Sequence, residues 1–185
     1  VPVSSPVATS TAFHETAKDG AMSVWTTTPD GRRTRIATDP EAVSYPVWSH
    51  DGAWLAVEVK RGDSTQVAVV PAAGGPVVQL TDARGQSWPH SWAPDNDRIA
   101  FAGQRGGVWN LYTVSRSTRA IVQLTTFDSP AGYVRYPAWS PRGGRVVMTS
   151  PFVGFITYSV LDGARVMLAD RHRHIEQARR VTMGA

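Results

Sequence analysis

Apolar and polar residues alternate in short runs along this chain, and one pattern of runs returns at a nearly constant interval. Its clearest copy covers residues 45–57, and further copies cover 88–101 and 136–148. Each copy has an aromatic residue before Pro, then a Trp, then turn-forming residues, and then a short apolar run. The residue before Pro favours extended geometry and Pro is tolerated at a strand start, so we expect each copy to enter a strand there and continue as a hairpin.

The Trp residues of the three copies, Trp48, Trp92 and Trp139, are 44 and 47 positions apart. Such a period is typical of propellers and solenoids. We therefore expect the three indoles to occupy equivalent buried sites on the innermost strands of successive units.

A second hairpin recurs in phase with the first. Residues 67–70 lead through Gly74-Gly75 to 77–81, and residues 111–114 lead to 121–125. Each unit therefore holds four short strands, which predicts an all-β fold: a β-propeller built of four-stranded antiparallel blades, with about four repeats, and so a partial or small propeller. We expect a domain over 1–170, divided at about 1–44, 45–86, 87–135 and 136–170, and a basic C-terminal tail over 171–185.

The first repeat departs from the others, because Ser4 stands where they have Trp. Its inner strand should be the least well anchored. Four repeats leave a strand exposed at each end, and unpaired strand edges invite other chains. We expect either that residues near 179–183 supply a strand beside the first repeat, or that self-association or another chain covers the blade edges.

Composition excludes several classes of protein. There is no Cys, and thus no disulfide, thiolate metal site or Cys nucleophile. No apolar run approaches the length of a membrane span, and no secretory signal is evident. The net charge of +4 comes largely from Arg, and four of the arginines lie in the tail. A solvated Arg-rich end explains them better than a nucleic-acid site.

The sequence aromatic-Pro-x-Trp-Ser-Pro-Asp-Gly, followed by a hairpin that ends in Gln-Leu-Thr, resembles the WD40-like PD40 repeat of TolB-type β-propellers. The resemblance covers residues 1 to about 170. It implies a bacterial protein in the periplasm or outside the cell, with the cytoplasm as the alternative. It also leaves two functions open: a non-catalytic module that binds a protein or peptide, or an accessory propeller of a larger enzyme, such as a prolyl-oligopeptidase-like hydrolase or a lyase.

Candidate catalytic and metal-binding groups are few. The nucleophile elbow Gly-x-Ser-x-Gly is absent. Ser49-His50-Asp51 consists of neighbouring residues on a strand and its turn, which cannot converge as a triad does, so we interpret it as a turn. His172 and His174 could share a strand face, but a solvated pair is the simpler interpretation. We expect no catalytic residues, no cofactor and no metal site.

Strand direction predicts where binding occurs. The turns between second and third strands must emerge on the same face as the long connections between repeats, and loops on a rigid scaffold commonly carry binding residues. We expect a protein or peptide to dock on this loop face, with Tyr133, Arg135 and Arg105 contributing most. The alternative is that the long loop before Arg135 only covers a hydrophobic patch. The complete candidate set is Arg61, Asp63, Arg84, Arg105, Asp128, Tyr133, Arg135 and Phe152.

Overall fold

The computed structural model describes residues 2–38, 42–130, 134–150, 154–159 and 165–167. Over these residues the chain forms strands, turns and loops, without a helix. No stretch of them makes a helix long and apolar enough to cross a membrane. Tyr133, Phe152 and the tail residues 171–185, including His172, His174 and 179–183, lie outside the described residues.

The strands form four antiparallel sheets of four strands, each in sequence order, as the repeat predicts. The first sheet contains β1 (Val3–Ser4), β2 (Thr11–Thr16), β3 (Met22–Thr27) and β4 (Arg33–Thr38). The second contains β5 (Val43–Trp48), β6 (Trp54–Arg61), β7 (Ser64–Pro71) and β8 (Val78–Gln79). The third contains β9 (Ser87–Trp92), β10 (Arg98–Arg105), β11 (Val108–Ser115) and β12 (Ile121–Gln123), and the fourth β13 (Arg135–Trp139), β14 (Arg145–Ser150), β15 (Gly154–Ser159) and β16 (Arg165–Met167).

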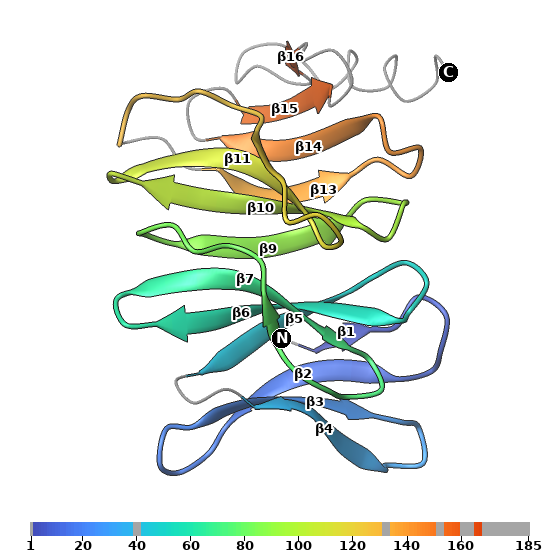
Figure 1. The fold of residues 1–185 in the computed structure, drawn as a ribbon. Coiled ribbons are helices and arrows are strands. Elements are labelled where there is room, and N and C mark those ends of the chain that lie inside the picture. Colours follow the sequence, from blue (N-terminus) through green and yellow to red (C-terminus); the bar gives the residue numbers. More distant parts are fainter. Residues whose placement is uncertain (1, 39–41, 131–133, 151–153, 160–164, 168–185) are drawn as a thin grey trace.

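The sheets stack face to face in chain order, with the first sheet at one end of the stack and the fourth at the other (Figure 1). The first strands contact one another, since β5 lies against β1, β9 against β5 and β13 against β9. Between neighbouring sheets lie three apolar clusters, which include Val24 with Leu55, Val69 with Trp92, and Leu111 with Met148. This is the blade arrangement of a propeller, present here as a partial one.

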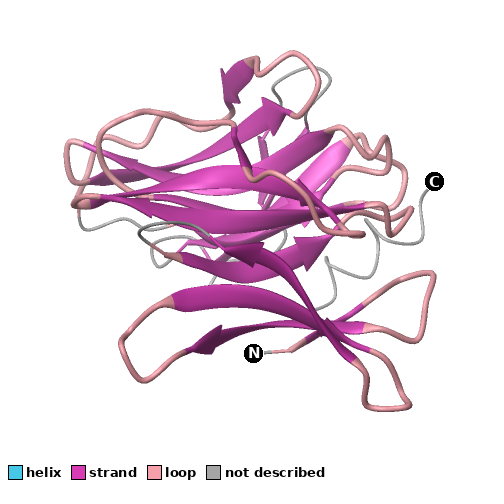
Figure 2. Ribbon diagram, turned by 60° about the horizontal axis from the view of Figure 1, so that its bottom comes forward, coloured by secondary structure: helices cyan, strands magenta, loops and turns pink. Residues whose placement is uncertain are grey.

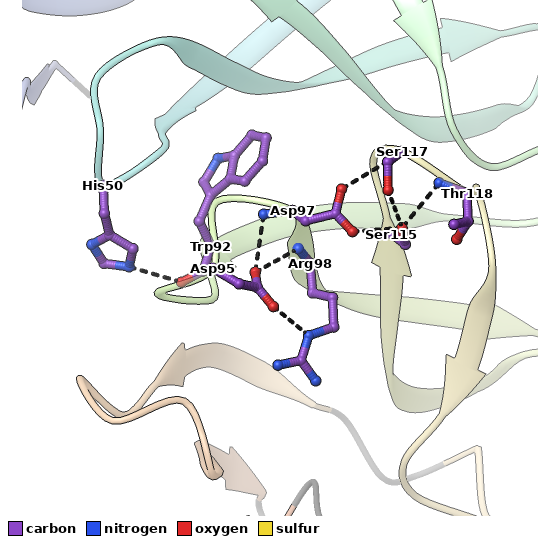
Figure 3. Close-up of polar contacts among 8 residues, drawn as sticks. All are labelled: His50, Trp92, Asp95, Asp97, Arg98, Ser115, Ser117 and Thr118. Atoms are coloured by element: carbon purple, nitrogen blue, oxygen red, sulfur yellow. Dashed lines mark hydrogen bonds and ion pairs between the residues drawn. The ribbon is translucent and has the colours of Figure 1, made fainter.

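The tight turns between first and second strands are held by Asp and Ser side chains (Figure 3). Asp95 Oδ1 accepts hydrogen bonds from the backbone N of Asp97 and of Arg98, at 2.9 and 3.0 Å. Asp97 in turn accepts from Ser115 Oγ at 2.6 Å, which ties this turn to the hairpin at the end of β11. Side chains that bond to nearby backbone groups favour turns over regular strand pairing, so these residues fix where the hairpins reverse.

Two of the three residues before Pro in the repeat, Tyr45 and Tyr136, do not adopt the extended geometry that the sequence predicts. Tyr45 has φ of 49° and Tyr136 has φ of 51°, both in the left-handed region. The strand pairing explains the difference. Val47 pairs with Ala56 while Ser44 pairs with Glu58, so two residues of β5 span the space opposite one residue of β6, as in a β-bulge. The expectation was wrong because cross-strand register outweighs the local preference of the pre-proline residue.

Each of the three Trp residues ends the first strand of its sheet and faces the sheet before it. Trp92 is 1% exposed and Trp139 is 9% exposed, whereas Trp48 is half-buried. The indole Nε1 of Trp48 donates to Val3 O at 3.1 Å, and that of Trp92 donates to Val47 O at 2.9 Å. We call this contact the indole latch.

The latch changes at the fourth sheet. The equivalent acceptor would be the carbonyl of Ser91, yet Trp139 Nε1 is buried and makes no hydrogen bond to any described residue. Instead, the backbone N of Trp139 donates to Ser91 Oγ at 2.8 Å. At the junction between the third and fourth sheets, a backbone N–H therefore donates across the sheets, whereas an indole N–H does so at the two earlier junctions.

We expect the hydrogen bond of the indole latch to contribute to the stability of the fold. Replacing Trp92 by Phe removes the indole N–H that donates to Val47 O and should lower the free energy of unfolding by about 1–3 kcal/mol. The matched control is Trp139→Phe, which removes an indole N that has no acceptor among the described residues and should cost less than about 1 kcal/mol. Urea denaturation followed by Trp fluorescence measures both. Equal losses in the two variants would show that packing, and not the hydrogen bond, explains the effect.

Candidate functional site

The loops gather at the two ends of the strands (Figure 2). One end carries the tight turns between first and second strands. The other end carries the turns between second and third strands together with the connections between sheets, and we call it the loop face. The described candidate residues of the loop face are Arg61, Asp63, Arg84, Arg105, Asp128 and Arg135.

Arg61 and Asp63 belong to the turn between β6 and β7. Arg61 Nε donates to Gln79 Oε1 at 2.9 Å, so its guanidinium lies along the sheet. The carbonyl of Asp63 accepts from Gln86 Nε2 at 3.0 Å, which joins this turn to the connection before β9. The side chains of Asp63 and Arg84 are exposed. This part of the loop face is held by hydrogen bonds between two loops while its charged groups stay accessible.

Arg105 has a positioning role in the same connection. Its guanidinium donates to the carbonyls of Gln86 and Gln104, at 2.9 and 2.8 Å, and to Ser87 Oγ at 2.9 Å. It also lies 5.5 Å from the ring centroid of Tyr112. Burial lowers the pKa of Arg105 from its ordinary value. Since its donors are used within the chain, Arg105 shapes the loop face more than it offers a free group to a partner.

Asp128 and Arg135 flank the long connection before β13, and both are exposed. The connection begins at a fixed point, because the backbone N of Phe127 donates to Asn110 Oδ1 at 2.7 Å. Phe127 and Val134 pack into the apolar cluster between the third and fourth sheets. Residues near both ends of the connection therefore belong to the apolar cluster, while Asp128 and Arg135 are exposed.

A repeated polar clamp, which was not predicted from the sequence, anchors these connections. Thr125 Oγ1 donates to Asn110 Oδ1 at 2.8 Å and accepts from the backbone N of Leu111 at 2.9 Å. One repeat earlier, Thr81 Oγ1 donates to Gln66 Oε1 at 2.7 Å and accepts from the backbone N of Val67. The signal was present in the recurring Gln-Leu-Thr, whose Thr residues are 44 positions apart.

A second group that was not predicted lies on β2, β5, β9 and β13 near the loop face. Tyr45 is 56% exposed and Tyr136 is 69% exposed, and both sit on the left-handed residues of their bulges. The ring of Tyr45 lies 4.8 Å from that of His14, and the ring of Tyr136 lies 6.2 Å from that of His90, edge-on. We call these four residues, together with Arg135, the inner-strand site.

Burial shifts the pKa values of His90 and Glu58 in opposite directions. Burial, and after it the charge of Arg135, lowers the pKa of His90 to about 4, so the ring is neutral at pH 7. Its Nε2 atom is buried and makes no hydrogen bond within the described part of the chain. Glu58 pairs in the sheet with Ser44, the residue before Tyr45, and burial raises its pKa to about 7. The carboxyl of Glu58 is therefore about half protonated near neutral pH.

The tight-turn face carries no Ser-His pair at Ser49-His50-Asp51. Ser49 Oγ donates to Asp51 Oδ1 at 2.6 Å. The ring of His50 instead bonds to the carbonyl of Trp92 in the next sheet at 3.0 Å (Figure 3). The hydroxyl and the imidazole thus serve different turns. Among the described residues, no three His, Asp or Glu side chains gather closely enough to hold a metal ion.

This geometry can be compared with known proteins. The family model described as TolB beta propeller domain matches residues 1–167. The chain belongs to this family. A Tol-Pal system protein TolB from Francisella tularensis subsp. mediasiatica (strain FSC147) is 31% identical over 85 residues, which are 45% of this chain and 20% of that protein. The match thus spans about a fifth of the length of that TolB relative.

Solved structures share the TolB-type fold. TolB from Acinetobacter baumannii superposes with a TM-score of 0.70 at 17% identity, over 88% of this chain and 42% of that chain. A puromycin-hydrolyzing peptidase of Mycobacterium tuberculosis gives a TM-score of 0.67 at 16% identity, over 91% of this chain and 28% of that one. At these identities the similarity establishes the propeller fold alone.

We expect Glu58 to make the stability of the fold depend on pH, because burial raises its pKa. Between pH 4.5 and 7 the unfolded chain releases this proton while the folded chain keeps it, so Glu58 makes stability fall as pH rises through that window. Gln at position 58 has no proton to release, so Glu58→Gln removes this fall in stability. The variant should therefore raise the free energy of unfolding at pH 8 by roughly 1–3 kcal/mol, with little change near pH 4. The control is Asp63→Asn, which alters an exposed carboxylate on the same hairpin. Urea denaturation across this range checks it, and a Glu58→Gln curve parallel to wild type would contradict it.

Proposed function

We propose that this chain is a non-catalytic propeller module that binds a protein or peptide at the inner-strand site and the adjoining loop face. The observation that carries the proposal is the pair of exposed tyrosines, Tyr45 and Tyr136, at the same position of two sheets. A non-Gly residue with positive φ costs on the order of 1 kcal/mol or more, and such strain clusters at functional sites. The bulges therefore place the rings of Tyr45 and Tyr136 in solvent although their left-handed backbone is strained.

The chemistry of the surrounding residues suits a polypeptide partner. Tyr and Arg are the side chains that most often dominate protein interfaces, and the inner-strand site offers Tyr45, Tyr136 and Arg135. Tyr133, in the connection before Arg135, is proposed to extend this surface. The exposed charges at Asp63, Arg84 and Asp128, with Arg61, form a rim, and Arg105 holds the rim in place.

The relatives support this class of function. The curated relatives are named as proteins of the Tol-Pal system, which favours a role in an assembly of proteins over one in nucleic-acid binding. On the same ground we propose a periplasmic or extracellular location.

A second candidate function is that of an accessory propeller in a larger enzyme. It is favoured by the likeness in fold to the mycobacterial peptidase, of which this chain covers 28%. The complete open reading frame distinguishes the two candidates, because the accessory role requires a hydrolase or lyase domain in the same polypeptide.

The binding proposal is tested with a triple variant, Tyr45→Ala, Arg135→Ala and Tyr136→Ala. A partner is first captured with the wild-type chain, starting from Tol–Pal components, and its affinity is then measured by calorimetry. Loss of one interface hot spot typically costs about 2 kcal/mol, so the triple variant should bind at least about 30-fold more weakly. The matched control is Val122→Ala, which trims a 53%-exposed side chain on the outer strand β12.

The outcome is interpreted together with the melting temperature. Unchanged affinity in a folded triple variant would reject the inner-strand site. Tyr45→Phe with Tyr136→Phe keeps both rings and should retain most of the affinity, so a loss in these milder variants would assign the effect to the hydroxyl groups.

A further inference from the structure

The outer strand of the third sheet, β12, has an open edge. It is the last strand in the order of its sheet, and among the described strands it pairs with β11 alone. The second and fourth sheets pack on the two faces of the third sheet, so they cover its faces and leave this edge open. The edge of β12 therefore lies between two neighbouring sheets and not at an end of the stack.

The register of β11 and β12 shows which backbone groups face outward. Leu124 N donates to Leu111 O at 2.8 Å, so the backbone at position 124 faces β11. Hydrogen-bonded positions alternate along an antiparallel pair, so the backbone of Val122 faces β11 as well. The N–H and C=O groups of Ile121 and Gln123 consequently point to the open edge, and none of them bonds to another described residue.

The other outer strands carry residues that discourage pairing with further chains. The strand β4 contains two arginines, Pro76 directly precedes β8, and β16 begins with Arg165. Charged side chains and Pro are common means of keeping a sheet edge from pairing. In the third sheet, Ala120 stands at the position of Pro76 and Ile121 at that of Arg165, so β12 lacks both devices.

The side chains of β12 are exposed, although their counterparts in the second sheet are packed. Val77 and Val78 are half-buried against the apolar clusters on the two faces of that sheet. At the equivalent positions of the third sheet, Ile121 is 44% exposed and Val122 is 53% exposed. The edge thus offers β-branched apolar side chains beside open backbone groups, which is the surface that an added strand uses.

Arg119 places a positive charge at the start of β12. Its side chain is exposed and meets no carboxylate among the described residues. The turn before it is held in place, because Thr118 N donates to Ser115 Oγ at 3.1 Å and Ser117 N donates to Asp97 Oδ1 at 2.9 Å (Figure 3). A carboxylate near the end of an added strand could therefore pair with Arg119 without breaking an ion pair of the described chain.

We propose that a partner protein adds an extended segment to β12, as a further strand of the third sheet. Its backbone bonds with the outward groups of Ile121 and Gln123, its apolar side chains lie beside Val122, and one of its carboxylates pairs with Arg119. Two strands separate β12 from the first strand of its sheet, so this edge is distinct from the inner-strand site. The proposal is therefore independent of the proposed function.

The test uses the complete chain and a short labelled peptide of alternating Val and Thr with Glu at each end. Comparison peptides have methylated backbone N atoms, or Lys in place of Glu, and binding is followed by fluorescence anisotropy. We expect the methylated peptide to bind at least about tenfold more weakly, because it cannot donate to the edge, and the Lys-ended peptide about three- to tenfold more weakly. Equal binding of the methylated peptide, or no binding of the Glu-ended peptide at about 1 mM, would overturn the proposal.

Amide hydrogen exchange, measured residue by residue, tests the register directly. We expect the amides of Ile121 and Gln123 to exchange fast in the free chain, and at least about tenfold more slowly once the Glu-ended peptide saturates it. The amide of Val122 bonds to β11 and should be protected in both states. Unchanged exchange at Ile121 and Gln123 in the saturated chain would overturn the proposal.

Variants of the strand assign binding to its edge. Ile121→Pro removes an outward N–H and keeps the bonds to β11, so it should weaken binding at least about tenfold. Ile121→Asp keeps the backbone and places a negative charge on the edge, and it should weaken binding as well. Full affinity in either folded variant would overturn the proposal.

The role of charge is tested separately. Arg119→Glu should weaken binding of the Glu-ended peptide about three- to tenfold. The matched control is Arg142→Glu, which makes the same change of charge at an exposed site in the β13–β14 turn and should leave affinity within about twofold. Equal losses in the two variants would overturn the pairing with Arg119, because they would indicate attraction to net charge alone.

A second copy of this chain is the competing occupant of the edge. Sedimentation of the wild-type chain over a range of concentrations measures it. A monomer that binds the Glu-ended peptide supports the proposal. A dimer that Ile121→Pro abolishes, together with no binding of the peptide, would overturn it and assign the edge to self-association.

Discussion

Two of the three junctions between the described sheets depend on the indole latch, in which a Trp at the end of one first strand donates to a backbone carbonyl on the first strand of the sheet before it. Trp48 reaches Val3 O and Trp92 reaches Val47 O, acceptors that are 44 residues apart. A strand buried between two sheets has carbonyls that must find donors, and a large ring that fills a core also needs a partner for its N–H. One contact meets both needs, which is why the Trp period sets the geometry of the inner strands.

A second repeated contact lies farther from the first strands, at the third and fourth strands of a sheet. The clamps at Gln66 with Thr81 and at Asn110 with Thr125 tie the third strand of a sheet to the segment that leaves its fourth strand. That segment becomes the connection to the next sheet, so its path over the loop face is determined before it reaches solvent. Two of the connections on the loop face therefore leave their sheets from an anchored residue, Thr81 in one and Thr125 in the other.

Much of the fold could be predicted from the sequence because it rests on period and turn chemistry, which are local. The spacing of Trp48, Trp92 and Trp139 and the Asp-Gly turns were sufficient to predict four-stranded antiparallel sheets in chain order. The exposure of Tyr45 and Tyr136 was not predictable in this way. It follows from pairing between β5 and β6, and between β13 and β14, whose register shifts become visible only when both strands are placed. The use of Arg105 within the chain depends likewise on where Gln86 and Ser87 lie.

The junction between the third and fourth sheets carries two buried polar atoms, His90 Nε2 and Trp139 Nε1, that make no hydrogen bond to any described residue. Each such atom lowers the cohesion of the surfaces that enclose it by roughly 1–3 kcal/mol. In an array whose units hold only their neighbours, cooperativity is set by the weakest interface. A hydrogen-bond partner supplied to each of these two atoms would therefore hold the fourth sheet more tightly to the third.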